Sequence, residues 1–132
     1  VDGAPNMIKK AKNLDKNGTY FNENIENWQN DFQYDVVFSM ETLYYFKSPL
    51  TIIKNIYNNI INENGLLIIG VDHYKENSES LDWAEKFNLE ITTLSCNEWQ
   101  NIFKEVGFKK VKLKQVESKD NWAGTLIISG IK

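Results

Sequence analysis

Polar and aromatic side chains gather directly after a short apolar stretch, and their types suit the binding of a ligand. The apolar stretch is Val36-Val37-Phe38, and the residues that follow it are Ser39, Glu41, Thr42, Tyr44 and Tyr45. A strand whose carboxyl end breaks into polar and aromatic residues is how an open α/β sheet forms a ligand crevice. The segment from Tyr34 to Phe46 therefore predicts a binding site at a strand end.

A second polar group follows the apolar run Leu66–Val71. Asp72 and His73 stand where that run ends, and His73 is the only histidine of the chain. Imidazole has an unperturbed pKa of ~6.5, so His73 is a candidate catalytic base toward a substrate nucleophile. A loop histidine without a catalytic role explains the position equally well. Asp72 is a candidate for binding or orienting a substrate amine.

The two apolar runs are expected to be neighbouring parallel strands. Tyr34–Met40 is short and rich in β-branched and aromatic residues, which predicts a strand buried on both faces. Ser48-Pro49 predicts a helix start, and apolar residues then recur at helical spacing to about Asn62. With Leu66–Val71 as the second strand, this order forms a right-handed parallel crossover. Both polar groups should therefore lie at one edge of the sheet.

The N-terminal segment is expected to be mixed and mostly polar. Pro5–Leu14 predicts a helix, because proline suits the first turn and apolar residues form a short face. Asn17-Gly18 is a turn signal. Thr19–Phe21 then predicts a short strand, and Asn22–Asp31 a loop with about one helical turn.

The C-terminal segment is expected to end in an antiparallel hairpin. Leu81–Phe87 predicts a short helix, and Ser95 to Glu98 forms a capping box for a helix that ends at Gly107. Lys109–Val116 alternates, with Lys110, Lys112 and Lys114 on a solvated face that suits an edge strand. Trp122–Ile131 predicts a more buried strand, and the short intervening loop makes the pair antiparallel.

The composition describes one acidic chain of 132 residues with a formal net charge of -3. Its length fits one domain, and 42% hydrophobic residues suffice for a core. The acidic balance disfavours a general nucleic-acid binder. A single cysteine, Cys96, cannot form a disulfide framework or a cysteine-rich metal site, and it favours a reducing, cytoplasmic setting. No metal-ligand spacing appears, and no apolar run approaches the ~18 residues of a membrane span.

Taken in order, these segments resemble the class I S-adenosylmethionine-dependent methyltransferases. VDGAPNMIKKAKNL resembles the end of the family's second strand and the next helix, and FNENIENW the adenine-contacting loop after the third strand. YDVVFSMETLYYF resembles the fourth strand, and SPLTIIKNIYNNIINENGLLIIGVDHY the helix and fifth strand. CNEWQNIFKEVGFKKVKL resembles the last helix and sixth strand, and WAGTLIISG the seventh. The resemblance comes from the order and spacing of these pieces more than from any one of them.

The resemblance implies an α/β fold with a Rossmann-like sheet, mostly parallel and closed by a C-terminal antiparallel hairpin. The family's strand order is 3-2-1-4-5-7-6. Its first strand, glycine-rich loop and following helix have no counterpart here, nor does most of its second strand. Residues 1–132 are therefore expected to form a single, partial domain in which Tyr34–Met40 keeps an unpaired edge. Because Val1-Asp2-Gly3 resembles a strand end, we expect the native polypeptide to begin earlier.

The resemblance also implies S-adenosylmethionine as cofactor. Asp2, followed by Gly3, matches the acidic position that accepts hydrogen bonds from the ribose hydroxyls, a task that suits a carboxylate. Asn24 and Ile25 match positions that touch adenine, although the family often has aspartate where Asn24 stands. Three further residues match the place where the chain passes the methionine end of the cofactor: Ser39, Met40 and Glu41.

On the substrate side, Tyr44 and Tyr45 are candidates to line the catalytic site or stack on a cation, unless one of them belongs to the core. Trp83 and Phe87 lie in a segment that often covers the acceptor in this family, but a helix packing its apolar face explains them better. Trp122 has the same ambiguity. The Cys96 thiol, in a first helical turn, is a candidate for a lowered pKa, although core or cap packing is the simpler reading.

The implied function is methyl transfer to an acceptor. A small molecule is the expected acceptor, because the short acidic chain has no basic face; no nucleic-acid or membrane partner is expected, and the oligomeric state stays open. The alternative is a non-catalytic methyltransferase-like binding or regulatory module, or a split fragment that needs upstream residues or a partner; the missing glycine-rich loop favours it. The antiparallel hairpin argues against a nucleotide-binding domain of another doubly wound family.

Overall fold

The computed structural model describes residues 1–132, which divide into two compact units, Val1–Asp31 and Phe32–Lys132. The first unit contains α1 (Pro5–Leu14), as predicted, with proline where its missing N–H is not needed. The predicted strand at Thr19–Phe21 is wrong. Its only backbone hydrogen bond to another segment runs from the Asp2 N–H to the Phe21 carbonyl, 3.1 Å long, and one bond does not make a strand ladder.

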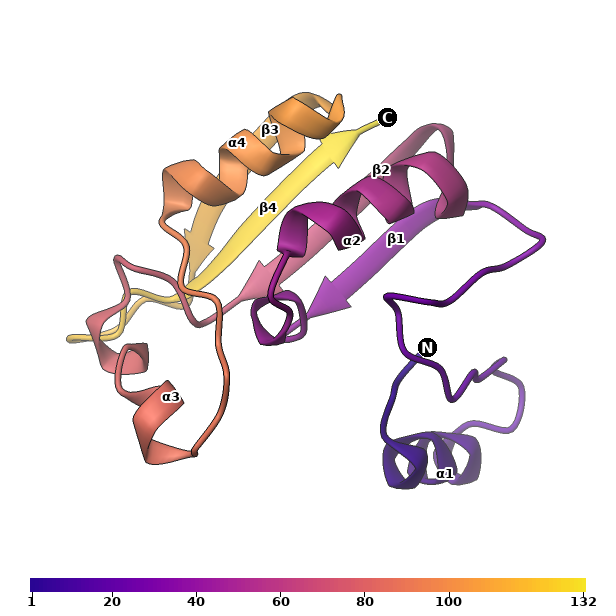
Figure 1. The fold of residues 1–132 in the computed structure, drawn as a ribbon, viewed down its shortest axis with the longest axis horizontal. Coiled ribbons are helices and arrows are strands. Elements are labelled where there is room, and N and C mark those ends of the chain that lie inside the picture. The colour runs from indigo at the N-terminus through magenta and orange to yellow at the C-terminus, as the bar shows by residue number, and fades with distance from the viewer. The chain divides into compact units, whose positions relative to one another are not determined.

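The second unit is built on a four-stranded mixed sheet in the order β1-β2-β4-β3 (Figure 1). Its strands are β1 (Tyr34–Met40), β2 (Ile61–Val71), β3 (Lys109–Val116) and β4 (Thr125–Ile131). β1 and β2 are parallel, and β4 is antiparallel to both of its neighbours. The predicted parallel pair and C-terminal hairpin are confirmed, and the order equals the 4-5-7-6 part of the family's sheet.

Two helices cover one face of this sheet (Figure 1). α2 (Pro49–Asn55) begins at Ser48, whose hydroxyl accepts the Thr51 N–H, and it continues as a π-helical turn to Ile60. α4 (Cys96–Val106) begins at the capping box predicted from Ser95 and ends at Gly107 with a left-handed φ of 115°. Glycine adopts that conformation without steric cost, which is why it terminates the helix.

The core lies between these helices and the sheet. Because side chains alternate along a strand, the side chains of β4 and of the C-terminal half of β2 that face α2 and α4 are buried. The buried residues are Leu67, Ile69 and Val71 of β2, Leu126 and Ile128 of β4, Ile52 and Ile53 of α2, and Trp99 and Phe103 of α4. This packing fixes β2 and therefore the position of the residues at its carboxyl end.

β1 is not buried on both faces, and that prediction is wrong. Val36 is 56% exposed and Phe38 61% exposed, because α2 and α4 cover the opposite face of the sheet. β1 is also the outer strand of the sheet, as predicted. The apolar run therefore belongs to an edge strand with one open face.

The segment between β2 and α4 is less helical than predicted. It contains a 3₁₀ turn, Ser78–Ser80, and a single helical turn, α3 (Trp83–Lys86), where the sequence predicted a helix over Leu81–Phe87. Figure 1 shows α3 beyond the carboxyl ends of β1 and β2. No α3 residue is buried, and Phe87 is 55% exposed, so a helix that buries its apolar face does not describe this segment.

The terminal hairpin differs from the prediction mainly in where its second strand starts. β4 begins at Thr125, not Trp122, because Gly124 turns the chain with a φ of 91°. Lys110, Lys112 and Lys114 of β3 are exposed at the sheet edge, as predicted. None of the helices is long and apolar enough to cross a membrane.

Candidate functional site

The end of β1 turns sharply at Glu41. Its φ is 52°, a left-handed value that is uncommon for a residue with a side chain, while its N–H still donates to the Gly70 carbonyl of β2 at 2.9 Å. The 3₁₀ turn Leu43–Tyr45 then brings the Tyr44 hydroxyl to Glu41 Oε2, to which it donates at 2.7 Å. The segment that follows β1 thus folds back so that Tyr44 contacts the Glu41 carboxylate.

Asp72 brings a second carboxylate to this edge. It directly follows β2, and because β1 and β2 are parallel, their carboxyl ends lie side by side. Glu41 Oε1 and Asp72 Oδ1 are both buried atoms that have no hydrogen-bond partner. Buried polar atoms in folded proteins are nearly always paired, so these two oxygens are suited to contact a bound molecule.

Burial raises the pKa of Glu41 from an ordinary 4.5 to about 7. The hydrogen bond from Tyr44 opposes this rise in pKa, the nearby charge of Asp72 adds to it, and a hydrogen bond from the Asp72 backbone opposes it. Desolvation and a like charge both disfavour the ionised form, whereas a donated hydrogen bond favours it. A carboxyl group with a pKa near neutrality can give or take a proton at physiological pH.

The tyrosine pair has one buried and one accessible member. Tyr44 is buried and Tyr45 is 47% exposed, with their ring centroids 4.5 Å apart and their hydroxyl oxygens 3.4 Å apart. Burial, with the hydroxyl of Tyr45 and the carboxylate of Glu41 beside it, raises the pKa of Tyr44. Tyr44 therefore stays a neutral donor that fixes Glu41, whereas the ring of Tyr45 is accessible at the surface.

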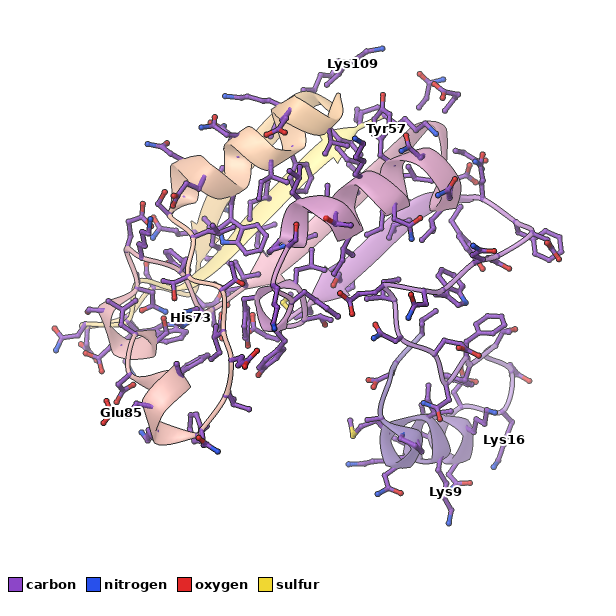
Figure 2. The ribbon with its side chains drawn as sticks, viewed as in Figure 1. Lys9, Lys16, Tyr57, His73, Glu85 and Lys109 are labelled. Carbon is purple, nitrogen blue, oxygen red and sulfur yellow. The ribbon has the colours of Figure 1, made fainter.

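His73 is buried, with only 1% of its surface exposed, and Figure 2 shows it beyond the sheet on the side of α3. Its Nδ1 lies 2.9 Å from the Ser80 carbonyl, which can only accept, so Nδ1 donates. Nε2 lies 2.7 Å from the Thr93 hydroxyl. Both ring nitrogens are occupied, so this geometry supports a structural role and gives no support to a catalytic base.

Aromatic rings surround His73. The Tyr44 ring lies 5.7 Å from the imidazole and the Trp83 ring 6.2 Å, between centroids. Trp83 in turn stacks on Trp122 at 6.3 Å. His73 therefore lies between Tyr44, which contacts Glu41, and the segment around α3. Sequence reasoning missed Ser80 and Thr93 as its partners, since they are 7 and 20 residues away with no pattern linking them.

Cys96 does not have the lowered thiol pKa considered from the sequence. Although it stands in the first turn of α4, burial raises its pKa to about 11, and the charge of Glu76 adds to the rise. The Glu76 carboxylate already accepts the Cys96 N–H, at 3.0 Å. The thiol is therefore protonated and unreactive at neutral pH, which fits the packing and capping reading.

A model of the family described as methyltransferase domain matches residues 1–113. The chain belongs to this family. No curated protein matches the sequence. The match runs through both compact units and covers every residue of the cluster formed by Glu41, Tyr44, Tyr45 and Asp72.

Solved structures of low sequence identity have the same fold. A putative methyltransferase of Haloferax volcanii, solved with its activator Trm112, is 22% identical with a TM-score of 0.80, covering 98% of this chain and 68% of that chain. The N-methyltransferase NodS of Bradyrhizobium japonicum, solved with S-adenosyl-L-homocysteine, is 17% identical with a TM-score of 0.77, covering 99% and 64%.

A possible histamine N-methyltransferase of Thermotoga maritima is 20% identical with a TM-score of 0.71, covering 83% of this chain. The chain spans 61% of the length of that protein, so it corresponds to part of these neighbours. The predicted Rossmann-like, class I methyltransferase fold is confirmed, and S-adenosylmethionine is the methyl donor of that class.

The N-terminal unit of this methyltransferase chain contains Asp2 and Gly3, which the sequence predicts to face the cofactor ribose. Asp2 is exposed, and only its Oδ1 is used, accepting the Ala4 N–H at 2.7 Å. Nothing lies within 4 Å of the place where a β-carbon of Gly3 would stand. Asn22 donates to the Asp2 carbonyl at 2.9 Å, which holds the loop after Phe21 beside Asp2. Asp2 Oδ2 and an open stretch of backbone are thus available to a diol.

The remaining predicted cofactor residues lie in two places. The Asn24 Oδ1 accepts the Glu26 N–H at 3.0 Å, and Ile25 is half-buried in the same turn. In β1, Ser39 pairs with Ile69, and the Met40 side chain lies against Gly70, where a β-carbon would collide with it. The structure brings Glu41 together with Tyr44, and Asp2 together with the loop at Asn22. The roles of these residues toward a cofactor stay predictions.

Proposed function

We propose that this chain transfers a methyl group from S-adenosylmethionine to a small-molecule acceptor. The observation that carries the proposal is the pair of buried, unpartnered carboxylate oxygens of Glu41 and Asp72, at the carboxyl ends of adjacent parallel strands. In open α/β sheets this edge is where ligands bind. A methyltransferase-domain sheet whose ligand-binding edge carries polar atoms without hydrogen-bond partners is suited to hold reacting molecules.

Bound S-adenosylmethionine supplies a methyl group on a positively charged sulfur. Asp2 Oδ2 accepts hydrogen bonds from the ribose diol, and the open backbone at Gly3 lets that sugar approach closely. Asn24 and Ile25 contact the adenine. In the second unit, the methionine end passes along the backbone at three residues, Ser39, Met40 and Glu41, which leaves the Glu41 carboxylate to the acceptor.

The acceptor side is formed by the carboxylate cluster and Tyr45. Tyr44 holds Glu41 by a charge-assisted hydrogen bond, and Tyr45 offers the exposed ring. Positioning the acceptor in line with the methyl group and excluding water supply most of the rate enhancement, because oriented reactants gain large effective concentrations. A small molecule is favoured over nucleic acid, since the chain carries a net charge of -3.

The cofactor part of the proposal is tested by calorimetric titration with S-adenosylhomocysteine. We expect the wild-type chain to bind, and Asp2→Asn to bind about tenfold or more weakly, a loss of about 1.4 kcal/mol. Asparagine keeps an oxygen for the Ala4 N–H but replaces one diol acceptor with a donor. Glu23→Gln is the matched control, because it removes an exposed carboxylate of the same unit.

Absence of binding by the wild-type chain would overturn the proposal and favour the non-catalytic, methyltransferase-like module. Equal weakening by Asp2→Asn and Glu23→Gln would show that net charge is responsible and would remove Asp2 from the ribose site. Transfer of a radiolabelled methyl group to small molecules, measured next, separates catalysis from binding alone.

A further inference from the structure

We propose that the methyl acceptor is an amine, bound by the carboxylates of Glu41 and Asp72 with its carbon skeleton against Tyr45. This inference rests on the proposed function and names the substrate class of the same site. It depends on three properties of the cluster: uncompensated negative charge, an aromatic surface beside that charge, and a carboxylate placed to receive a proton.

The negative charge of the cluster is not balanced by the protein. The three ion pairs of the structure join Lys47 to Glu90, Lys75 to Glu98 and Lys132 to Glu63, and none involves either carboxylate of the cluster. Glu41 Oε1 and Asp72 Oδ1 are nevertheless buried and unpartnered. Buried carboxylates are costly unless a cation or several donors meet them. An ammonium group supplies three N–H donors and a positive charge in one ligand.

The aromatic surface is the ring of Tyr45. Tyr45 is exposed and packs its ring against that of Tyr44, whose hydroxyl touches Glu41 Oε2 at 2.7 Å. A cation over or beside an aromatic ring is attracted by the electron-rich face, and an organic chain buries apolar surface there. A hydroxyl or carboxylate acceptor gains neither the charge contact with Glu41 nor the cation–aromatic contact.

The ammonium group of the cofactor itself is a less suitable occupant. The methionine end of the cofactor is a zwitterion, which carries a carboxylate next to its ammonium group. The only charged group that acts on Glu41 is another carboxylate, Asp72, so the cofactor's carboxylate would meet repulsion without a compensating cation. An amine acceptor without that carboxylate fits two acidic side chains better.

Proton transfer to Glu41 prepares the amine for attack. A protonated amine has no lone pair, so one N–H bond must break while an O–H bond forms on the Glu41 carboxylate. The freed nitrogen pair then forms the N–C bond as the methyl carbon leaves sulfur, which keeps the electron pair. The raised pKa of Glu41, about 7, makes its carboxylate a stronger base than an ordinary one.

The test compares matched amines and alcohols on the chain saturated with S-adenosylhomocysteine. Three pairs are titrated by calorimetry: butylamine and butanol, 2-phenylethylamine and 2-phenylethanol, and putrescine and butanediol. We expect at least one amine to bind about tenfold or more tightly than its alcohol, and Glu41→Gln to abolish that preference. Glutamine keeps an acceptor for the Tyr44 hydroxyl, so the fold is preserved. Glu85→Gln, an exposed carboxylate of α3 (Figure 2), is the matched control.

Each other outcome overturns the inference. Equal binding of amines and alcohols, or no amine binding by a chain that binds S-adenosylhomocysteine, removes the amine site and leaves the proposed function standing. If Glu41→Gln weakens S-adenosylhomocysteine but not 5′-methylthioadenosine, which lacks the amino-acid end, Glu41 binds the cofactor's ammonium instead. Failure of the wild-type chain to bind S-adenosylhomocysteine defeats the proposed function itself.

Discussion

Each of the two parallel strands is followed by a buried polar side chain, but only one of these side chains has all its hydrogen bonds made within the protein. At the end of β1, Glu41 keeps one buried oxygen without a partner. At the end of β2, His73 is buried two residues beyond Val71 with both ring nitrogens hydrogen-bonded. A fully paired buried side chain contributes to stability, whereas an unpaired one is costly in the absence of a ligand. The comparison favours a structural role for His73 and leaves one Glu41 oxygen available to a ligand.

Asp72 stands between these two cases. Its backbone carbonyl accepts the Asn77 side chain at 2.8 Å, which helps fold the loop after β2, while its Oδ1 is buried and unpartnered. One residue therefore serves the loop with its main chain and the candidate site with its side chain. Asp72 thus combines a hydrogen-bonded backbone carbonyl with a side-chain oxygen that has no partner.

The largest expected effect comes from replacing His73. His73→Ala removes the partners of the Ser80 carbonyl and the Thr93 hydroxyl and leaves a cavity among Tyr44 and Trp83, so we expect a loss of about 3 kcal/mol in unfolding free energy. Urea denaturation measures it. Thr93→Val, which removes one of the two bonds, is expected to cost about 1 kcal/mol. An unchanged stability of His73→Ala combined with lost methyl transfer would reverse the comparison and make His73 the base.

The next effect is a pH dependence of stability that comes from Glu41. Folding raises its pKa from 4.5 to about 7, so the folded chain binds the proton more tightly than the unfolded chain. Its contribution to stability is therefore full below pH 4.5 and is lost as the pH rises through about 7. Besides burial, three interactions act on the carboxyl group: the hydrogen bond from Tyr44 lowers its pKa, the charge of Asp72 raises it, and a hydrogen bond from the Asp72 backbone lowers it.

Glu41→Gln removes this titration. Between pH 8 and pH 5 we expect the wild-type chain to gain about 2 kcal/mol more stability than the variant, allowing for partial solvent screening of a 1.36 kcal/mol effect per pKa unit. Urea denaturation across that pH range gives both profiles. Parallel profiles for the two proteins would mean that Glu41 titrates normally and is not desolvated.

The order and pairing of the strands could be predicted because they rest on long, consistent patterns. The Ser95–Glu98 capping box, the lysine side of β3 and the apolar run of β2 each agree with their surroundings, and each is observed. Local signals of this kind reflect interactions between residues a few positions apart. They fix where an element starts and which face it presents.

Predictions failed where burial depends on the rest of the fold. The β1 run Val36–Phe38 has the composition of a doubly buried strand, yet its burial requires a second layer that no local pattern reports. Thr19–Phe21 likewise needed a partner strand. The role of His73 could not be predicted either, because Ser80 and Thr93 reach it only through the folding of the loop.

The smallest expected effect separates the two tyrosines. Tyr44→Phe removes the hydrogen bond that lowers the pKa of Glu41, so we expect that pKa to rise above about 7. Stability at pH 8 should fall by about 1 kcal/mol, because an ionised acceptor loses a donated bond. Carbon-detected NMR titration of the Glu41 carboxyl and urea denaturation measure the two changes.

Tyr45→Phe is the matched control, since its hydroxyl lies 3.4 Å from that of Tyr44 and its side chain is exposed. If both variants shift the pKa of Glu41 equally, the tyrosines act together; if neither does, Tyr44 does not hold Glu41 in its ionised form, and the β1 end is fixed by backbone alone.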